Sequence, residues 1–293
     1  MLNRFFKVSL LFSLSLAMIS FPIIAQANTL SDKIAYTGNI QRDTVIVRIA
    51  TGATERKLSK TNEWVPVAIG MPLNKEDIIR TGKNSFILLE LPENSGYVRL
   101  LPESEMRVDK ISVTKGSQGG QITEFYLSKG KIVTKVRKFN RPTSKLEIHT
   151  KSSTAAVRGT SFLTSFNDDN ETRVLVGDGR VSVKAQNKEV FVNPKEFTNV
   201  ALDGEPITPS LVDSKIDFKI SSMKANNSFL NVSGSVDTDA QINLNHVSVF
   251  PNEDGSFVGD LRLKEGENDV TIKASTIDGR EKEKLIKVLK FTK

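Results

Sequence analysis

The sequence of 293 residues contains no cysteine, two histidines and one tryptophan. Without cysteine there are no disulfides, so a globular chain must be stabilised by a buried apolar core. His149 lies near several serines in "LEIHTKSS". A catalytic triad also needs a positioned acid and an oxyanion hole, which proximity in sequence does not supply. The sequence therefore predicts a protein that is not an enzyme and holds no cofactor.

Long apolar runs are missing after the first 27 residues. A basic start, an apolar run over residues 8–24 and an Ala-Gln-Ala step ending at Ala27 follow one another. This order is typical of a secretory signal peptide, with cleavage after Ala27. No later stretch reaches the roughly 18 apolar residues of a membrane-spanning helix. We expect residues 1–27 to be a signal peptide and 28–44 a lead segment, and the mature protein to be periplasmic, in the cell envelope or secreted.

Charge of one sign is not in large excess either. The full chain has 41 basic and 34 acidic residues, and loss of residues 1–27 would leave 39 and 34, a net charge of +5. The basic residues are scattered, with few aromatic residues between them. Such a balance is typical of a solvated surface, so we expect no nucleic-acid partner.

No segment keeps a helical apolar period for long, which predicts an all-β fold. Alternating apolar residues between glycine, proline or polar turns indicate strands. They lie at residues 85–92, 96–102, 106–114 and 145–150.

Two further segments carry turn signals. Residues 121–136 are expected to turn at Ser128-Lys129-Gly130, and Asp178-Gly179 predicts a hairpin within residues 172–185. Aligning Gly130 with Gly179 gives a weak internal sequence similarity, too weak to establish a repeat.

Prolines 206 and 209 mark residues 205–216 as a linker between two domains. Residues 217–293 then hold about seven short strands with turns every ten or so residues. This spacing is typical of a small β-sandwich.

The segment "MPLNKEDIIRTGKNSFILLELPENSGYVRLLPESEM" resembles the opening of the FecR-type envelope domain family. Its matching positions are Leu73, Asp77, Ile78, Thr81, Gly82, Ser85, Pro102 and Ser104. Further on, Val157-Arg158-Gly159-Thr160 with Phe162 is similar to the Val-Arg-Gly-Thr-x-Phe signature of that family, and we call these five residues the family motif. The resemblance covers roughly residues 45–204. A curled β-sandwich and a short β-solenoid both suit the strands.

The founding FecR-type proteins sense iron–citrate transport and pass the signal to a cytoplasmic sigma factor. The resemblance implies an envelope domain that receives another protein or a ligand. The tail, residues 217–293, resembles bacterial immunoglobulin-like envelope modules. The matching positions there are Gly234, Asp237, Ala240, Asp254 to Phe257, Glu265, Gly266, Asn268, Asp278 and Gly279, with His246 in place of a turn glycine.

Arg158 stands among small residues and has two interpretations. Its guanidinium offers five donors in a fixed fork, which suits backbone carbonyls or a carboxylate. We favour a buried, satisfied arginine that ties strands together over one that contacts a partner.

Trp64 has two interpretations. It is a candidate sugar-stacking platform, although packing at the edge of the core is favoured because Val65, Val67 and Ile69 continue an apolar alternation beside it.

Two acidic segments are candidates for calcium binding. Residues 166–172 and 236–245 concentrate the oxygen ligands that calcium prefers. They lack the spacing of a calcium loop, so solvated turns are favoured and no metal site is predicted.

These observations predict a non-catalytic exported protein of two β domains. The first domain would take up an envelope protein through a strand edge or loop set, and the second would set spacing or add avidity. The alternatives are a protein that binds cell-wall glycan, supported by export, positive charge and the tail module, and a structural spacer without a partner.

Overall fold

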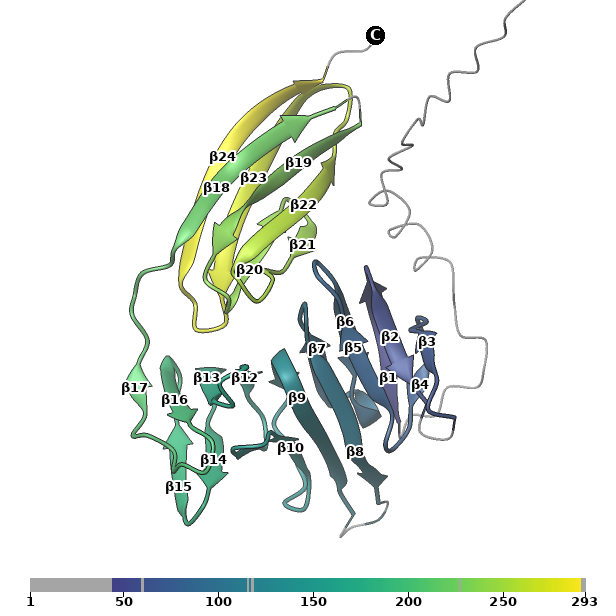
Figure 1. The fold of residues 1–293 in the computed structure, drawn as a ribbon, viewed down its shortest axis with the longest axis vertical. Coiled ribbons are helices and arrows are strands. Elements are labelled where there is room, and N and C mark those ends of the chain that lie inside the picture. Colours follow the sequence, from purple (N-terminus) through teal and green to yellow (C-terminus); the bar gives the residue numbers. More distant parts are fainter. Residues whose placement is uncertain (1–43, 59–60, 115, 117–118, 227, 291–293) are drawn as a thin grey trace, which may run out of the picture.

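The computed structural model describes residues 44–58, 61–114, 116, 119–226 and 228–290. Its regular structure in these ranges consists of strands β1 to β24, with a short 3-10 turn at Pro92–Asn94 between β6 and β7. The all-β prediction is therefore confirmed (Figure 1). No helix in these ranges is long and apolar enough to cross a membrane. The predicted signal peptide, and the lead segment up to residue 43, lie outside the described residues.

Strands β1 to β17 are joined by hydrogen bonds into one sheet that folds into two layers. We call the layers sheet 1 and sheet 2. Sheet 1 contains β1 (Val45–Thr51), β4 (Pro72–Leu73), β6 (Phe86–Glu90), β7 (Gly96–Leu100), the second half of β9 (Gln121–Val136), β12 (Ser161–Phe166), β13 (Thr172–Asp178), β16 (Glu196–Val200) and β17 (Ser210–Leu211).

Sheet 2 lies against sheet 1 and shares β9 with it. It contains β2 (Thr54–Lys57), β3 (Trp64–Pro66), β5 (Ile78–Thr81), β8 (Glu105–Val113), the first half of β9, β10 (Lys145–His149), β11 (Thr154–Val157), β14 (Val181–Ala185) and β15 (Lys188–Val192). One continuous cluster of buried side chains from both sheets forms the core.

The predicted turn at Ser128-Lys129-Gly130 is wrong, because β9 runs through it as one strand. The buried positions of β9 are odd-numbered up to Leu127 and even-numbered from Gly130 onward. This change of phase lets the strand bend out of sheet 2 into sheet 1 while its apolar side stays inside. Gly130 has φ +85°, and a β-carbon there would lie 2.6 Å from Ser104 Cα, so the bend requires glycine.

The hairpin predicted at Asp178-Gly179 is also wrong. Strand β13 pairs with β12 and β16 in sheet 1, whereas β14 pairs with β11 and β15 in sheet 2. Gly179 (φ +81°) therefore marks a crossing between layers, as Gly130 does. An Asp-Gly turn signal reports the backbone conformation of the turn, and it leaves open whether the flanking strands pair.

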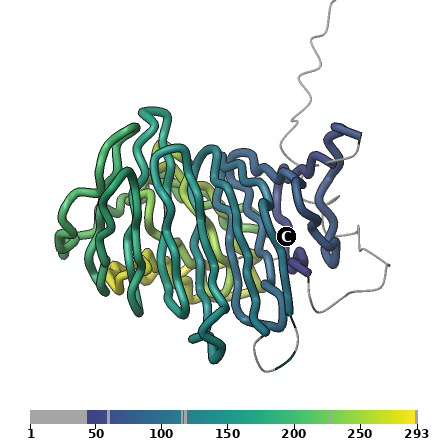
Figure 2. The backbone as a smooth tube through the Cα atoms, turned by 90° about the horizontal axis from the view of Figure 1, so that it is seen from below, coloured from purple at the N-terminus to yellow at the C-terminus, as the bar shows by residue number. Residues whose placement is uncertain are grey.

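The two architectures suggested by the sequence are combined in the first seventeen strands. Strands follow each other nearly in chain order along both sheets, as in a solenoid, and Figure 2 shows this advance from purple to green. Neighbouring strands are antiparallel apart from β9 and β10, as in most sandwiches. The predicted strands at residues 85–92, 96–102, 106–114 and 145–150 correspond to β6, β7, β8 and β10.

The last seven strands form two smaller antiparallel sheets around a second core. Sheet 3 contains β18 (Phe218–Ala225), β19 (Phe229–Val236) and β22 (Ser256–Arg262). Sheet 4 contains β20 (Ala240–Leu244), β21 (Val247–Val249), β23 (Gly266–Thr276) and β24 (Glu281–Lys290). Within residues 205–216, predicted as a linker, β17 pairs with β16 and is thereby held on sheet 1.

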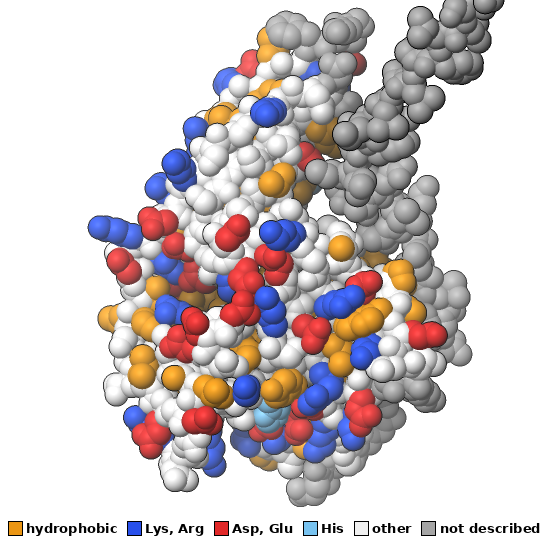
Figure 3. Space-filling model, viewed as in Figure 1, with side chains coloured by type: hydrophobic (Ala, Val, Ile, Leu, Met, Phe, Trp, Pro, Cys, Tyr) orange, Lys and Arg blue, Asp and Glu red, His pale blue; other side chains and the backbone are white. Residues whose placement is uncertain are grey.

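The C-terminal sheets lie against the outer face of sheet 1 (Figure 1). The Asn252 side chain exchanges hydrogen bonds with Asn84, at 2.8 Å to its backbone nitrogen and 3.2 Å to its side-chain oxygen. The Phe250 ring meets Phe86 edge to face at 4.9 Å, and Lys129 pairs with Glu253 at 3.4 Å. Figure 3 shows acidic and basic side chains gathered along this junction.

Candidate functional site

The family motif lies where the chain leaves β11 in sheet 2 and enters β12 in sheet 1. Val157 and Phe162 point into the core and are buried. Gly159 has φ +146°, and a β-carbon there would lie 2.7 Å from the backbone nitrogen of Lys138. Thr160 is buried, and its backbone carbonyl accepts a hydrogen bond from Val136 at 2.9 Å. Four of the five motif residues thus have a structural role at this crossing.

Arg158 differs from the prediction of a buried arginine, because its side chain is exposed. It donates a hydrogen bond to the Pro142 carbonyl, and its own carbonyl accepts one from Phe139 at 2.7 Å. The physical reason is its place in the strand: Ala155 and Val157 take the inward positions of β11, and Arg158 follows at the crossing. The arginine fastens a loop, and part of its guanidinium faces solvent.

A groove of about 390 Å³ passes beside Arg158 on the outer face of sheet 2. Ala156 and Ser182 face one another across β11 and β14, and their short side chains leave the surface of the sheet recessed there. We call this the motif groove. It is lined by Thr143, Lys145, Ala156, Val157, Arg158, Arg180, Ser182, Glu189 and Phe191.

The motif groove combines positive charge with an exposed aromatic ring. Phe191 is 54% exposed, and the Arg180 guanidinium lies 5.8 Å from the ring centroid. Arg180 donates to Asn193 and Arg158 to a carbonyl; within the described residues neither forms an ion pair with a carboxylate. The groove carboxylate, Glu189, accepts a hydrogen bond from Ser182. The surface is thus suited to an acidic, partly apolar ligand.

An unpaired strand edge borders the groove. Strand β15 pairs with β14 on one side and has no second ladder partner among the described residues. An extended segment of another chain can bond to such an edge. Arg180 and Phe191 were not among the functional residues predicted from the sequence. The signal for Phe191 is the apolar alternation Val190-Phe191-Val192, in which one residue faces out.

Comparison with protein families identifies a segment that contains most of this groove, whereas Glu189, Phe191 and strand β15 lie beyond its end. Residues 77–182 match the family described as FecR protein. These residues form a FecR domain. The matched segment lies inside the 45–204 range suggested by the sequence and includes all five motif residues.

The solved structures that resemble the chain include two of the "putative anti-sigma factor" of Parabacteroides distasonis ATCC 8503, at 1.65 Å and 2.50 Å resolution. Each is 20% identical, with a TM-score of 0.38, and the match covers 46% of this chain. The match spans 60% of the length of the solved chain, and likeness at this level carries no argument about function. The comparison with curated proteins finds no match.

Trp64 precedes the FecR domain, on edge strand β3. It is half-buried, the Arg80 guanidinium lies 3.8 Å from its ring centroid, and Lys57 lies at 6.0 Å. Arg80 is itself held by Glu55 at 2.6 Å. One face of the indole is therefore covered by a fixed cation, which agrees with packing at the edge of the core; sugar stacking by Trp64 stays a prediction.

His149 lies on the outer face of sheet 2. Its Nδ1 is 3.0 Å from Thr154 Oγ1 and its Nε2 is 3.6 Å from Glu147. A hydroxyl, an imidazole and a carboxylate thus meet, but Lys145 already pairs with Glu147 at 2.8 Å. Glu124 completes a possible three-ligand metal cluster, yet Lys110 and Lys145 lie 3.7 and 3.9 Å from its carboxylate. These ammonium groups supply the positive charge that a metal ion would bring.

The two acidic segments considered for calcium are also paired with basic groups. Asp168 lies 3.5 Å from Lys129. In the second segment Arg280 holds Asp239 at 2.6 Å and Asp237 at 3.4 Å, and it also pairs with Asp278 at 2.8 Å. Burial lowers the pKa of the Arg280 guanidinium, but hydrogen bonds and charge from Asp278 and Asp239 together outweigh it and raise the pKa. This part of the structure uses its carboxylates for ion pairs.

Proposed function

We propose that this protein is a non-catalytic, exported envelope protein that receives a protein partner on the two-layered β domain containing the FecR segment. The observation that carries the proposal is the motif groove: the arginine of the family motif is exposed beside Arg180, an exposed phenylalanine and the open edge of β15. The resemblance of the first 27 residues to a signal peptide supports export.

The partner is an extended segment that carries acidic residues and an apolar side chain. Its backbone pairs with β15, its carboxylates meet Arg158 and Arg180, and its apolar side chain packs on Phe191. Strand addition gives affinity through main-chain hydrogen bonds, while the groove selects the side chains. The C-terminal sheets, which the sequence suggests are an immunoglobulin-like module, set the distance of this surface from other envelope components.

Site-specific photo-crosslinking in cells tests this function. A photoreactive residue replaces Phe191, and in a matched control it replaces Phe229, which is 42% exposed in the C-terminal sheets. We expect one protein to crosslink from position 191 and not from 229, and to be lost when Arg158→Ala and Arg180→Ala are added. Equal capture from both positions, or capture of wall glycan alone, would contradict the proposal.

A further inference from the structure

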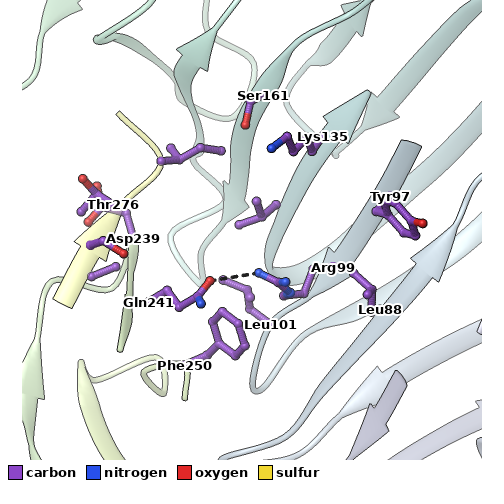
Figure 4. Close-up of a pocket in the computed structure, with 14 residues that line it drawn as sticks. Leu88, Tyr97, Arg99, Leu101, Lys135, Ser161, Asp239, Gln241, Phe250 and Thr276 are labelled. Carbon is purple, nitrogen blue, oxygen red and sulfur yellow. Dashed lines mark hydrogen bonds between the residues drawn. The ribbon is translucent and has the colours of Figure 1, made fainter. Parts of the chain in front are cut away.

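A cleft of about 280 Å³ lies between sheet 1 and the C-terminal sheets (Figure 4). Its floor comes from two rows of outward-facing residues on sheet 1. One row contains Leu88, Arg99 and Val133, which face one another across β6, β7 and β9. The other contains Tyr97, Lys135 and Ser161. The C-terminal sheets contribute Gln241, Phe250 and Ile277 among other lining residues.

Arg99 brings a positive charge into this cleft without a negative partner. Its Nη1 donates to the neutral amide oxygen of Gln241 at 3.2 Å, and its guanidinium lies 4.7 Å from the Phe250 ring centroid. Its Nε is buried and has no hydrogen-bond partner in the described part of the chain. Burial lowers the pKa of the Arg99 guanidinium. A buried donor on a charged group without an acceptor is costly, so a bound anion would remove that cost.

The charged groups around Arg99 do not supply that anion. Asp239 also lines the cleft, but Arg280 holds its carboxylate at 2.6 Å. Lys135 faces the cleft from the row beside Arg99 and adds a second positive charge at its exposed rim. The cleft is thus positive on its sheet 1 side.

Apolar side chains form much of the remaining lining. They are Leu88, Leu101, Val133, Phe250 and Ile277, and the polar Ser161, Ser275 and Thr276 lie beside them. A site of this size lies just below the range of typical ligand-binding cavities, roughly 300 to 1,000 Å³, and therefore suits a small ligand. A bare inorganic anion would leave these apolar walls without a partner.

We propose that this cleft binds an organic carboxylate that carries one small apolar group. The carboxylate accepts hydrogen bonds from the Arg99 guanidinium, and the apolar group packs against Leu101, Val133 and Phe250. The source is either a free organic acid or the C-terminus of a peptide, which share this chemistry. Because both halves of the molecule line the cleft, the ligand also holds them together. The site is separate from the motif groove and does not depend on the proposed function.

Calorimetric titration of the full exported chain tests the proposal. The probes are 3-phenylpropanoate and its neutral amide, together with a tetrapeptide ending in leucine with a free or an amidated C-terminus. We expect an acid to bind and its amide to bind at least about tenfold more weakly, because the amide loses the charge-assisted hydrogen bonds. Binding of the free acid identifies a small-molecule source, and binding of the free-ended peptide alone identifies a peptide terminus. A raised melting temperature in the presence of the acid gives a second readout.

Arg99→Gln should weaken acid binding by about tenfold or more, since the bidentate donor is lost. Arg173→Gln is the matched control: Arg173 is another half-buried arginine at this junction, stacked 3.7 Å from the Phe197 ring centroid outside the cleft. It should leave affinity unchanged. Val133→Phe, which fills the cleft and keeps Arg99, should also abolish binding. Equal binding of acid and amide, unchanged affinity in Arg99→Gln, or no binding of either acid at about 10 mM would overturn the proposal.

Discussion

Arg56 and Arg158 have opposite environments: Arg56 is buried, whereas Arg158 is exposed. Arg56 is buried on β2; its Nη2 lies 2.6 Å from Asp77 and its Nη1 donates to the Pro72 carbonyl at 3.0 Å. Asp77, one of the FecR-type pattern positions, is almost fully buried and also accepts from the Asn74 backbone at 2.5 Å. The buried arginine that ties strands together is therefore Arg56, and not Arg158.

We predict that Arg56→Met destabilises the protein by about 3–5 kcal/mol, because it leaves the Asp77 carboxylate buried and unpaired. Arg158→Met should cost less than about 1 kcal/mol, since an exposed side chain loses one hydrogen bond to a carbonyl. Urea denaturation of both variants measures the difference. Similar losses of stability in the two variants would show that Arg158 supports the fold as Arg56 does.

Gly159 gives a second residue-scale prediction. Alanine at this position must adopt φ +146° and place its β-carbon against the Lys138 backbone, so Gly159→Ala should cost about 2–4 kcal/mol. Gly266 is the control: its φ is +82°, and no atom lies within 4 Å of the added carbon. Gly266→Ala should cost only about 1 kcal/mol, from backbone conformation alone. The two melting temperatures separate crowding from strain, and equal losses would exclude crowding as the cause.

At the scale of elements, the crossings between the two sheets determine the fold. Ser104 illustrates how one is fastened, because its Oγ accepts a hydrogen bond from the Lys131 backbone at 2.8 Å just after the bend of β9. Strand β9 then continues between β7 and β12, and its first half lies between β8 and β10. The strand therefore has a partner on both sides over most of its length.

We predict that amides of β9 exchange slowly through the bend, including residues 127–133, because ladder bonds and the Ser104 contact satisfy them. Amides of β15, which has one ladder partner among the described residues, should exchange faster. Hydrogen–deuterium exchange with mass spectrometry on overlapping peptides compares the two. Fast exchange confined to residues 128–131 would instead support a turn at that place.

Several individual strands could be predicted from the sequence, whereas their partners could not. Apolar alternation located β6, β7, β8 and β10 because burial on one face imposes a period of two. At Gly130 and Gly179 the same turn residues serve crossings between layers, and the pairing depends on contacts with strands distant in the chain. For the site, the family motif correctly indicated the crossing from β11 to β12. The exposure of Arg158 could not be predicted, because it depends on which side of β11 faces the core.

At the scale of the whole molecule, the junction between sheet 1 and the C-terminal sheets contains several half-buried cations. Lys131 lies there, with its Nζ 3.5 Å from the Thr238 carbonyl. Burial lowers its pKa from the usual 10.5 to about 8, although Glu253, Asp239 and Glu103 act in the opposite direction. The junction therefore holds a lysine whose charged form is disfavoured by folding.

Because of Lys131, we predict that the free energy of unfolding rises with pH. Because its pKa is lower in the folded state, the unfolded chain binds more protons between about pH 8 and 10.5, and the free energy of unfolding increases across that window. Below pH 8 Lys131 is protonated in both states, so the cost of burying its charge destabilises the folded protein in full. Lys131→Met should raise stability at pH 7 by up to about 3 kcal/mol and flatten the rise from pH 8 to 10. Lys135→Met, an exposed neighbour on β9, should follow the parent protein. Urea denaturation across pH compares them, and parallel profiles for the parent and Lys131→Met would mean that Lys131 remains hydrated at the junction.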